Sequence, residues 1–255
     1  MYCPIFVVVR TGSSRLPGKA LLKIGGKPLI KILIDRVNSS KIPNLIVVCT
    51  TNKKSDDELS KFLRSVNIEV FRGSEKDVLR RLYQAGKKYK TKWFVVVEGD
   101  DIFCDPELID KTCKKLESTS FDFIFWKNLP LGVSPIGIKT KSLQKLIEKK
   151  INKNTDTGWG QLIIESNLFK VGKLNPPSKK LARPQIRLTI DYKEDFELAK
   201  KLLEKLPKKF SLLNLINILD KNKEWKKINE KVKEKYWDNF SEKRIKIKLK
   251  KEKEK

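Results

Sequence analysis

The fold of this chain is decided by positions 5–19, IFVVVRTGSSRLPGK, where an unbroken apolar run leads directly into a loop rich in glycine, serine and cations. A short Val/Ile run of this kind is typical of a strand buried on both faces. The loop at 10–19 then brings hydroxyls, flexible backbone and positive charge together, in Arg10, Gly12, Ser13, Ser14, Arg15, Gly18 and Lys19. Such a combination predicts a phosphate-binding cradle, and the alternative is a flexible basic loop. It has neither the spacing of a Walker loop nor that of a dinucleotide-binding loop.

The first half of the chain alternates short apolar runs with amphipathic segments. Strands are expected at 5–9, 45–50, 69–71, 94–98 and 122–126, and helices at 28–38, 56–65, 75–88 and 106–117. This order predicts an α/β fold with a mostly parallel sheet covered on both faces. Ligands of such sheets bind beyond the carboxyl ends of the strands, where the loop at 10–19 lies.

The alternation weakens after Leu131. Further strands are expected at 133–139 and 187–190, a polar loop at 154–160, and helices at 141–150, 193–206, 212–219 and 225–236. We therefore divide the chain into a catalytic domain (1–206), a helical extension (207–242) and a basic tail expected to be disordered (243–255). The apolar stripe of 212–219 is expected to dock on the catalytic domain or on a second subunit, so a homodimer is an open option.

Composition excludes several kinds of chemistry. The 255 residues include no histidine, which removes Ser-His-Asp and Cys-His nucleophiles and His-ligated zinc. The four cysteines form no CxxC pair, and no leader or membrane-length apolar run is visible, so we expect reduced thiols in a soluble, cytoplasmic protein. The net charge of +26 favours polyanionic partners. Because the charge is spread along the chain, a solvated lysine-rich surface is favoured over a nucleic-acid interface.

The loop at 10–19 and GGKPL at 25–29 closely resemble the signature of cytidylyltransferases that make CMP-activated sugar acids. The branch that it most resembles is that of spore coat polysaccharide biosynthesis, beside the CMP-Kdo and CMP-acylneuraminate synthetases. Further matching motifs follow in order, at 71–79 (FRGSEKDVL), 98–100 (EGD), 105–110 (DPELID) and 187–191 (RLTID). The resemblance implies a Rossmann-like nucleotidyltransferase fold. It also implies transfer of CMP from CTP to a 3-deoxy-2-keto sugar acid or related acidic acceptor, with release of pyrophosphate, in the synthesis of surface polysaccharide precursors.

The resemblance also implies residue roles. Asp100 and Asp191 match metal-binding aspartates and would hold Mg²⁺, although a carboxylate after a strand can also be a cap or turn residue. Arg10, Arg15 and Lys19 would act with Asp100 in catalysis, holding the triphosphate and its developing charge. The nucleotide is expected to contact the first loop (Arg10, Gly12, Ser13, Ser14, Lys19) and a second segment, Arg72, Gly73, Ser74 and Asp77. Ser74 has an alternative role as the cap of the helix expected at 75–88.

The chain departs from the branch at two places, which points to a different acceptor pocket. It has Glu98-Gly99-Asp100 where Thr-Gly-Asp is usual, and NTDTGWG at 154–160 where the branch has Glu-x-Glu-His-Val-Thr. Glu98 would add negative charge, and Trp159 would form an aromatic wall or, alternatively, a packing anchor. Arg183 and Arg187 are candidate acceptor ligands, or they pair with Glu194 or Asp195.

Two other functions remain open. A GT-A-like glycosyltransferase also places an aspartate after a strand, as in the sequence Gly99-Asp100-Asp101, but its diphosphate substrate would not need the loop at 10–19. A nucleic-acid-binding protein is supported by net charge alone, since no RRM, KH or helix-turn-helix signature is present.

Overall fold

The computed structural model describes residues 2–243, 246 and 248–250. Among these residues, seven strands form one sheet in the order β5-β4-β1-β6-β8-β7-β9. All neighbouring pairs are parallel except those that β8 makes with β6 and β7. The strands are β1 (Ile5–Val8), β4 (Ile46–Thr51), β5 (Glu69–Gly73), β6 (Trp93–Glu98), β7 (Phe123–Trp126), β8 (Ile136–Lys139) and β9 (Val171–Leu174). A small antiparallel pair, β2 (Lys23–Ile24) and β3 (Lys27–Pro28), follows the first loop.

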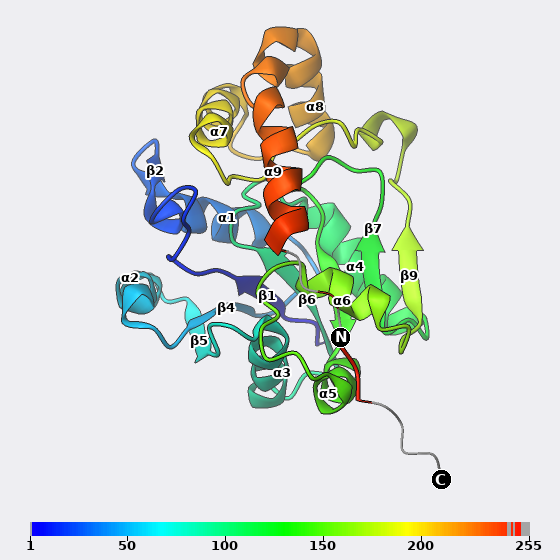
Figure 1. Cartoon of the computed structure of the whole chain (residues 1–255). Coiled ribbons are helices and arrows are strands. Elements are labelled where there is room, and N and C mark those ends of the chain that lie inside the picture. Colours follow the sequence, from blue (N-terminus) through cyan, green and yellow to red (C-terminus); the bar gives the residue numbers. More distant parts are fainter. Residues whose placement is uncertain (1, 244–245, 247, 251–255) are drawn as a thin grey trace.

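The strands separate two apolar cores because successive side chains point to opposite faces of the sheet. In β1, Ile5 and Val7 enter one core, whereas Phe6 and Val8 enter the other. The first core is covered by α1 (Leu29–Val37), α2 (Asp57–Ser65), α4 (Pro106–Ser118), α7 (Lys193–Lys205) and α8 (Leu212–Lys221). The second is covered by α3 (Val78–Lys88), α5 (Thr140–Lys149) and α6 (Trp159–Glu165) (Figure 1). The α/β fold with a mostly parallel sheet is confirmed.

The C-terminal helices pack on this domain. The apolar residues of α8, Leu212, Leu215, Ile216 and Leu219, are buried in the first core, so the stripe docks within the chain. A 3₁₀ turn (Lys223–Lys227) then leads to α9 (Glu230–Lys243), which runs from the region of α7 and α8 toward β1 and β6 (Figure 1). In the described part of the chain, no helix is long and apolar enough to cross a membrane.

Several expected elements differ from the structure. The stretch at 187–190 is not a strand: it makes a single bridge, Leu131 to Arg187, and its backbone otherwise follows the loop before α7. α3 begins at Val78 because Asp77 caps it, accepting from Arg80 N at 3.1 Å. The helix expected at 225–236 is divided into the 3₁₀ turn and α9, and both α6 and β9 were missed.

Part of the tail expected to be disordered pairs with the end of α5. Ile151 N donates to Lys248 O and Lys250 N donates to Lys149 O, each at 2.8 Å. Residues 244–245, 247 and 251–255 of that tail lie outside the described residues.

Candidate active site

A cavity of about 380 Å³ opens at the carboxyl ends of β1 and β6. It brings together residues that the sequence singled out from four separate segments: Arg10, Gly12, Ser13, Ser14, Arg15, Lys19, Glu98, Asp100, Trp159 and Asp191. Thus four segments meet in one place: the loop after β1, the turn after β6, the 154–160 segment and the segment before α7. The position of the strand ends predicted this meeting point.

The first loop is fixed at its start by a buried carboxylate. Asp56 is 1% exposed and accepts from Thr11 N at 2.8 Å and Thr11 Oγ1 at 2.6 Å. The same carboxylate accepts from the hydroxyls of Thr50 and Thr51 at the end of β4. Burial raises the pKa of Asp56, but the hydrogen bonds from Thr11 and Thr51 outweigh it and hold the pKa below its usual value. At the other end of the loop, Gly18 has φ of 65°, a backbone conformation that favours glycine, and it turns the chain toward Lys19.

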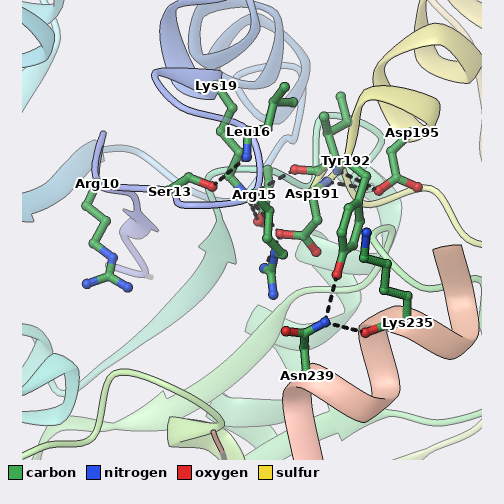
Figure 2. Close-up of polar contacts among 12 residues, drawn as sticks. Arg10, Ser13, Arg15, Leu16, Lys19, Asp191, Tyr192, Asp195, Lys235 and Asn239 are labelled. Atoms are coloured by element: carbon green, nitrogen blue, oxygen red, sulfur yellow. Dashed lines mark hydrogen bonds and ion pairs between the residues drawn. The ribbon is translucent and has the colours of Figure 1, made fainter.

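Lys19 lies between the two aspartates predicted to bind metal. Its Nζ donates to Asp100 Oδ2 at 2.5 Å, to Asp191 Oδ1 at 3.0 Å and to Ile190 O at 3.0 Å (Figure 2 shows Lys19 near Asp191). Burial lowers the pKa of Lys19, yet Asp100 and Asp191 reverse the direction and raise it. Burial likewise raises the pKa of Asp191, but Lys19 and Arg15 prevail and hold it at about 2. The ammonium of Lys19 and the carboxylate of Asp191 are therefore both charged at neutral pH.

Asp191 is held by two arginines as well. Arg15 Nη2 donates to Asp191 Oδ1 at 2.5 Å, and Arg187 Nη2 donates to Asp191 Oδ2 at 3.0 Å. Arg187 also binds Asp195 through two hydrogen bonds of 2.9 Å, and its side chain is only 3% exposed. Arg187 does not line the cavity. It pairs with Asp195, one of the alternatives left open by the sequence, and orients Asp191 from behind.

The turn after β6 depends on Gly99. Its N donates to Val8 O at 2.8 Å, and a Cβ at this position would lie 2.5 Å from Val9 Cβ. Only glycine permits this approach of the two strand ends, which sets Glu98 and Asp100 beside the first loop.

Trp159 is a buried anchor that also lines the cavity. It is 5% exposed, packs in the second core, and donates from Nε1 to Glu98 Oε1 at 2.7 Å. Burial and the charge of Asp100 raise the pKa of Glu98 to about 7, although the Trp159 hydrogen bond opposes this. Burial and Asp100 also raise the pKa of Asp101 well above its usual value, despite a hydrogen bond from Thr189.

A second ion pair lies apart from the group of Lys19, Asp100 and Asp191. Arg10 Nη2 donates to Asp156 Oδ2 at 2.5 Å, joining the first loop to the 154–160 segment. In Figure 2, Arg10 points away from the group formed by Arg15, Lys19 and Asp191. The cavity therefore has charged groups in two separate places.

The second predicted nucleotide segment does not line the cavity. Arg72 binds Thr51 O, Lys53 O and Asp57 Oδ1, and Gly73 lies in β5. Ser74 Oγ accepts from Asp77 N, so it caps the turn before α3 rather than the helix itself. Asp77 is buried against Lys150 Nζ at 2.6 Å. Arg183 also lies away from the cavity. None of these five predicted residues therefore lines the cavity.

Residues from α3 and α9 that were not predicted do line the cavity: Arg81, Tyr236, Asn239 and Phe240. Arg81 is 1% exposed, and its Nε has no partner among the described residues. It lies two residues beyond the matched motif at 71–79, and no residue pattern in the sequence marked it as a site residue. No sequence signal distinguished the α9 residues, because only the course of the chain brings that helix to the cavity.

Within the described residues, no group of three or more Cys, Asp or Glu side chains converges as a complete metal site. Asp100 and Asp191 instead form a pair that faces the same cation, Lys19.

A family comparison matches residues 5–228 to the cytidylyltransferases. The chain belongs to the cytidylyltransferase family. The match includes the first loop, both aspartates and the 154–160 segment, but it ends before α9. It confirms the resemblance on which the expected activity rests.

Individual cytidylyltransferases and related proteins agree with this placement. The chain is 40% identical to an uncharacterised protein of Methanocaldococcus jannaschii over 92% of this chain and 98% of the relative. It is 33% identical to the spore coat polysaccharide biosynthesis protein SpsF of Bacillus subtilis, over 86% and 94% respectively. A cytidylyltransferase structure from Leptospira borgpetersenii superposes with a TM-score of 0.80 at 26% identity, covering 88% of this chain and 96% of that one. The branch suggested by the sequence is therefore confirmed.

Proposed function

We propose that this cytidylyltransferase transfers CMP from CTP to an acidic sugar, of the 3-deoxy-2-keto class, and releases pyrophosphate. The observation that carries the proposal is the convergence of Lys19, Asp100 and Asp191 beside the glycine- and serine-rich loop in one cavity. Relatives named for this chemistry add support. One is a 3-deoxy-manno-octulosonate cytidylyltransferase of Idiomarina loihiensis, 31% identical over 44% of each chain, and SpsF is named for spore coat polysaccharide biosynthesis. Surface polysaccharide precursor synthesis is the corresponding role.

The first loop would bind the triphosphate. Ser13 and Ser14 carry hydroxyl donors, and Arg10, Arg15 and Lys19 carry positive charge toward the cavity. In the reaction, an acceptor hydroxyl oxygen forms a bond to the α-phosphorus of CTP while the bond to the bridging oxygen of the β-phosphate breaks. Pyrophosphate leaves with that oxygen, and the acceptor proton passes to solvent. Fixed cations favour this step because negative charge grows on the departing pyrophosphate.

The paired carboxylates fit Mg²⁺. Asp100 Oδ2 and Asp191 Oδ1 face one common cation, the Lys19 ammonium, and carboxylate oxygens are the ligands that Mg²⁺ takes from proteins. A protein contribution of two carboxylates is sufficient because substrate phosphates and water complete the coordination. When bound there, Mg²⁺ would neutralise phosphate charge and orient the triphosphate. Asp191 would be held in place for this role by Arg15 and Arg187.

The two alternatives considered from the sequence gain no support. The family match favours nucleotidyl transfer over glycosyl transfer. Nucleic-acid binding still rests on net charge alone. A homodimer and a cytoplasmic location stay predictions.

The test is release of pyrophosphate from CTP, UTP and ATP, each with 3-deoxy-manno-octulosonate or N-acetylneuraminate and with or without Mg²⁺. We expect release that requires CTP, Mg²⁺ and an acid, together with a CMP-sugar product identified by mass. Release that does not depend on any acid, or an equal rate with all nucleotides, would contradict the proposal.

A further inference from the structure

Helix α9 contributes a side of the cavity that the family match does not include. Tyr236, Asn239 and Phe240 all line the cavity, whereas the match ends at residue 228, before α9 begins at Glu230. Any property that these three residues give to the cavity is therefore particular to this chain and its near relatives.

The base of α9 is firmly attached to the residues behind Asp191. Asn229 Nδ2 donates to Arg187 O at 3.1 Å and to Asp195 Oδ1 at 2.8 Å, and Val232 is buried. The start of the helix is thus fixed to the same arginine and aspartate that orient Asp191.

The rest of α9 is held against the cavity by aromatic and polar contacts. The guanidinium carbon of Arg187 lies 4.4 Å from the centre of the Tyr236 ring, and that of Arg15 lies 5.7 Å from it. Asn239 Nδ2 approaches the Tyr192 hydroxyl at 3.4 Å (Figure 2). Cation–π contacts of this kind fix the orientation of a ring without enclosing it in a core. Tyr236 therefore connects α9 to Arg15, one of the predicted phosphate ligands.

The aromatic groups on α9 face in two ways. The rings of Tyr236 and Phe240 are stacked with centroids 6.1 Å apart, and both line the cavity. Trp237, between them in sequence, is 46% exposed and does not line it. An amide next to two rings suits a polyhydroxylated ligand, because rings pack on the C–H faces of a sugar and the amide binds its hydroxyls.

The opposite side of the cavity suits the nucleotide better. It is formed by Val78 and Arg81 of α3, and the Arg10–Asp156 pair lies away from the Arg15 and Asp191 group that α9 contacts. With the triphosphate on the first loop, the acceptor would occupy the α9 side, next to Arg15 and Asp191.

We infer that α9 forms the acceptor-binding wall of the cavity and that Phe240 and Asn239 select a sugar acceptor, with Tyr236 positioning the helix against Arg15. The inference rests on the proposed function. It assigns a specificity role to residues beyond the shared family region.

The experiment compares Phe240→Ala and Asn239→Ala with Glu234→Ala, a control at an exposed position of the same helix that does not line the cavity. Trp237 is not used as the control because its ring packs edge-on against Tyr236 and Phe240. The KM for the acid and the KM for CTP are measured separately by pyrophosphate release, using 3-deoxy-manno-octulosonate and N-acetylneuraminate. We expect about a tenfold higher acceptor KM for Phe240→Ala, the size of one lost ring contact, with CTP KM and melting temperature unchanged. Glu234→Ala should match the wild type. Equal acceptor KM values for Phe240→Ala and Glu234→Ala, or a parallel rise in the KM for CTP, would overturn the inference.

A wild-type protein that forms no CMP-sugar from CTP would instead overturn the proposed function. In that case the helix is tested by calorimetric titration of the two acids into the wild type, Phe240→Ala and Glu234→Ala. Weaker binding in Phe240→Ala alone supports the wall. Equal binding in all three proteins, or no binding of either acid, contradicts it.

Discussion

The ammonium of Lys19 lies 3.0 Å from the carboxylate of Asp191, although 172 positions separate the two residues in the chain. Asp100 meets the same ammonium at 2.5 Å. The side chain of Lys19 is only 12% exposed, so it is not a solvated loop cation. In the folded protein its positive charge neutralises the carboxylates of Asp100 and Asp191. If a divalent cation neutralised these carboxylates instead, the ammonium would be available to the triphosphate.

Replacing Lys19 should therefore affect both activity and stability. We expect Lys19→Ala to lower kcat with CTP by about 100-fold, the usual effect of removing one group that stabilises developing charge. The melting temperature without ligands should also fall, because Asp100 and Asp191 lose their shared cation. Steady-state kinetics and thermal melts measure the two effects, with the exposed Lys23→Ala as control. Unchanged turnover would remove Lys19 from the triphosphate cradle.

Replacing Asp100 and replacing Asp191 should have different effects on the stability of the folded protein. Asp100→Asn loses one ion pair, with Lys19, whereas Asp191→Asn weakens contacts with Lys19, Arg15 and Arg187 at a buried site. Both variants should need far more Mg²⁺ for activity, but only Asp191→Asn should be strongly destabilised, by about 3–5 kcal/mol as for other broken buried pairs. Mg²⁺ titration and denaturant unfolding check this. Normal activity of Asp100→Asn at limiting Mg²⁺ would exclude Asp100 as a ligand.

Asp56 should make the first loop sensitive to acid. Its folded pKa is lowered by hydrogen bonds from Thr11 and Thr51, so its ionised form stabilises the folded state. That contribution is complete above the unfolded pKa of about 3.9 and is lost as pH falls through the lower folded value. The difference in unfolding free energy between wild type and Asp56→Asn should thus be largest at neutral pH and shrink below about pH 4. The exposed Asp220→Asn provides the comparison, and a difference that grows in acid would contradict the assignment.

Two substitutions of Trp159 should separate the effect of its packing from the effect of its hydrogen bond to Glu98. Trp159→Ala is expected to cost about 3–5 kcal/mol of unfolding free energy, as for other buried aromatics. Trp159→Phe keeps most of the ring packing but removes the donor to Glu98 Oε1. We expect Trp159→Phe to retain most stability, so that any change in the KM for CTP or for the acceptor reports the lost hydrogen bond to Glu98. If both variants lose CTP and acceptor binding in proportion to their stability, Trp159 is an anchor without a role in acceptor binding.

Local sequence was sufficient for the main strands and helices of the first half of the chain and for the edge of the sheet at which the cavity opens. The run at 5–9 indicated the central strand, Asp105 before Pro106 indicated the start of α4, and the loop at 10–19 indicated the anion-binding edge. These features depend on side-chain alternation, capping and turn chemistry among neighbouring residues, which act over a few positions.

The tertiary structure alone decided which charged groups meet. Arg72 was a predicted nucleotide ligand, yet packing gives it Asp57 as a partner. For Arg187 the sequence left both a ligand role and an ion pair open, and the structure selects the pair with Asp195. Arg81 and Phe240 carried no such signal, yet the course of α3 and α9 places both at the cavity. The physical reason is that burial of a charge requires a partner, and that partner is supplied by whichever distant segment the apolar cores bring alongside, which local patterns do not encode.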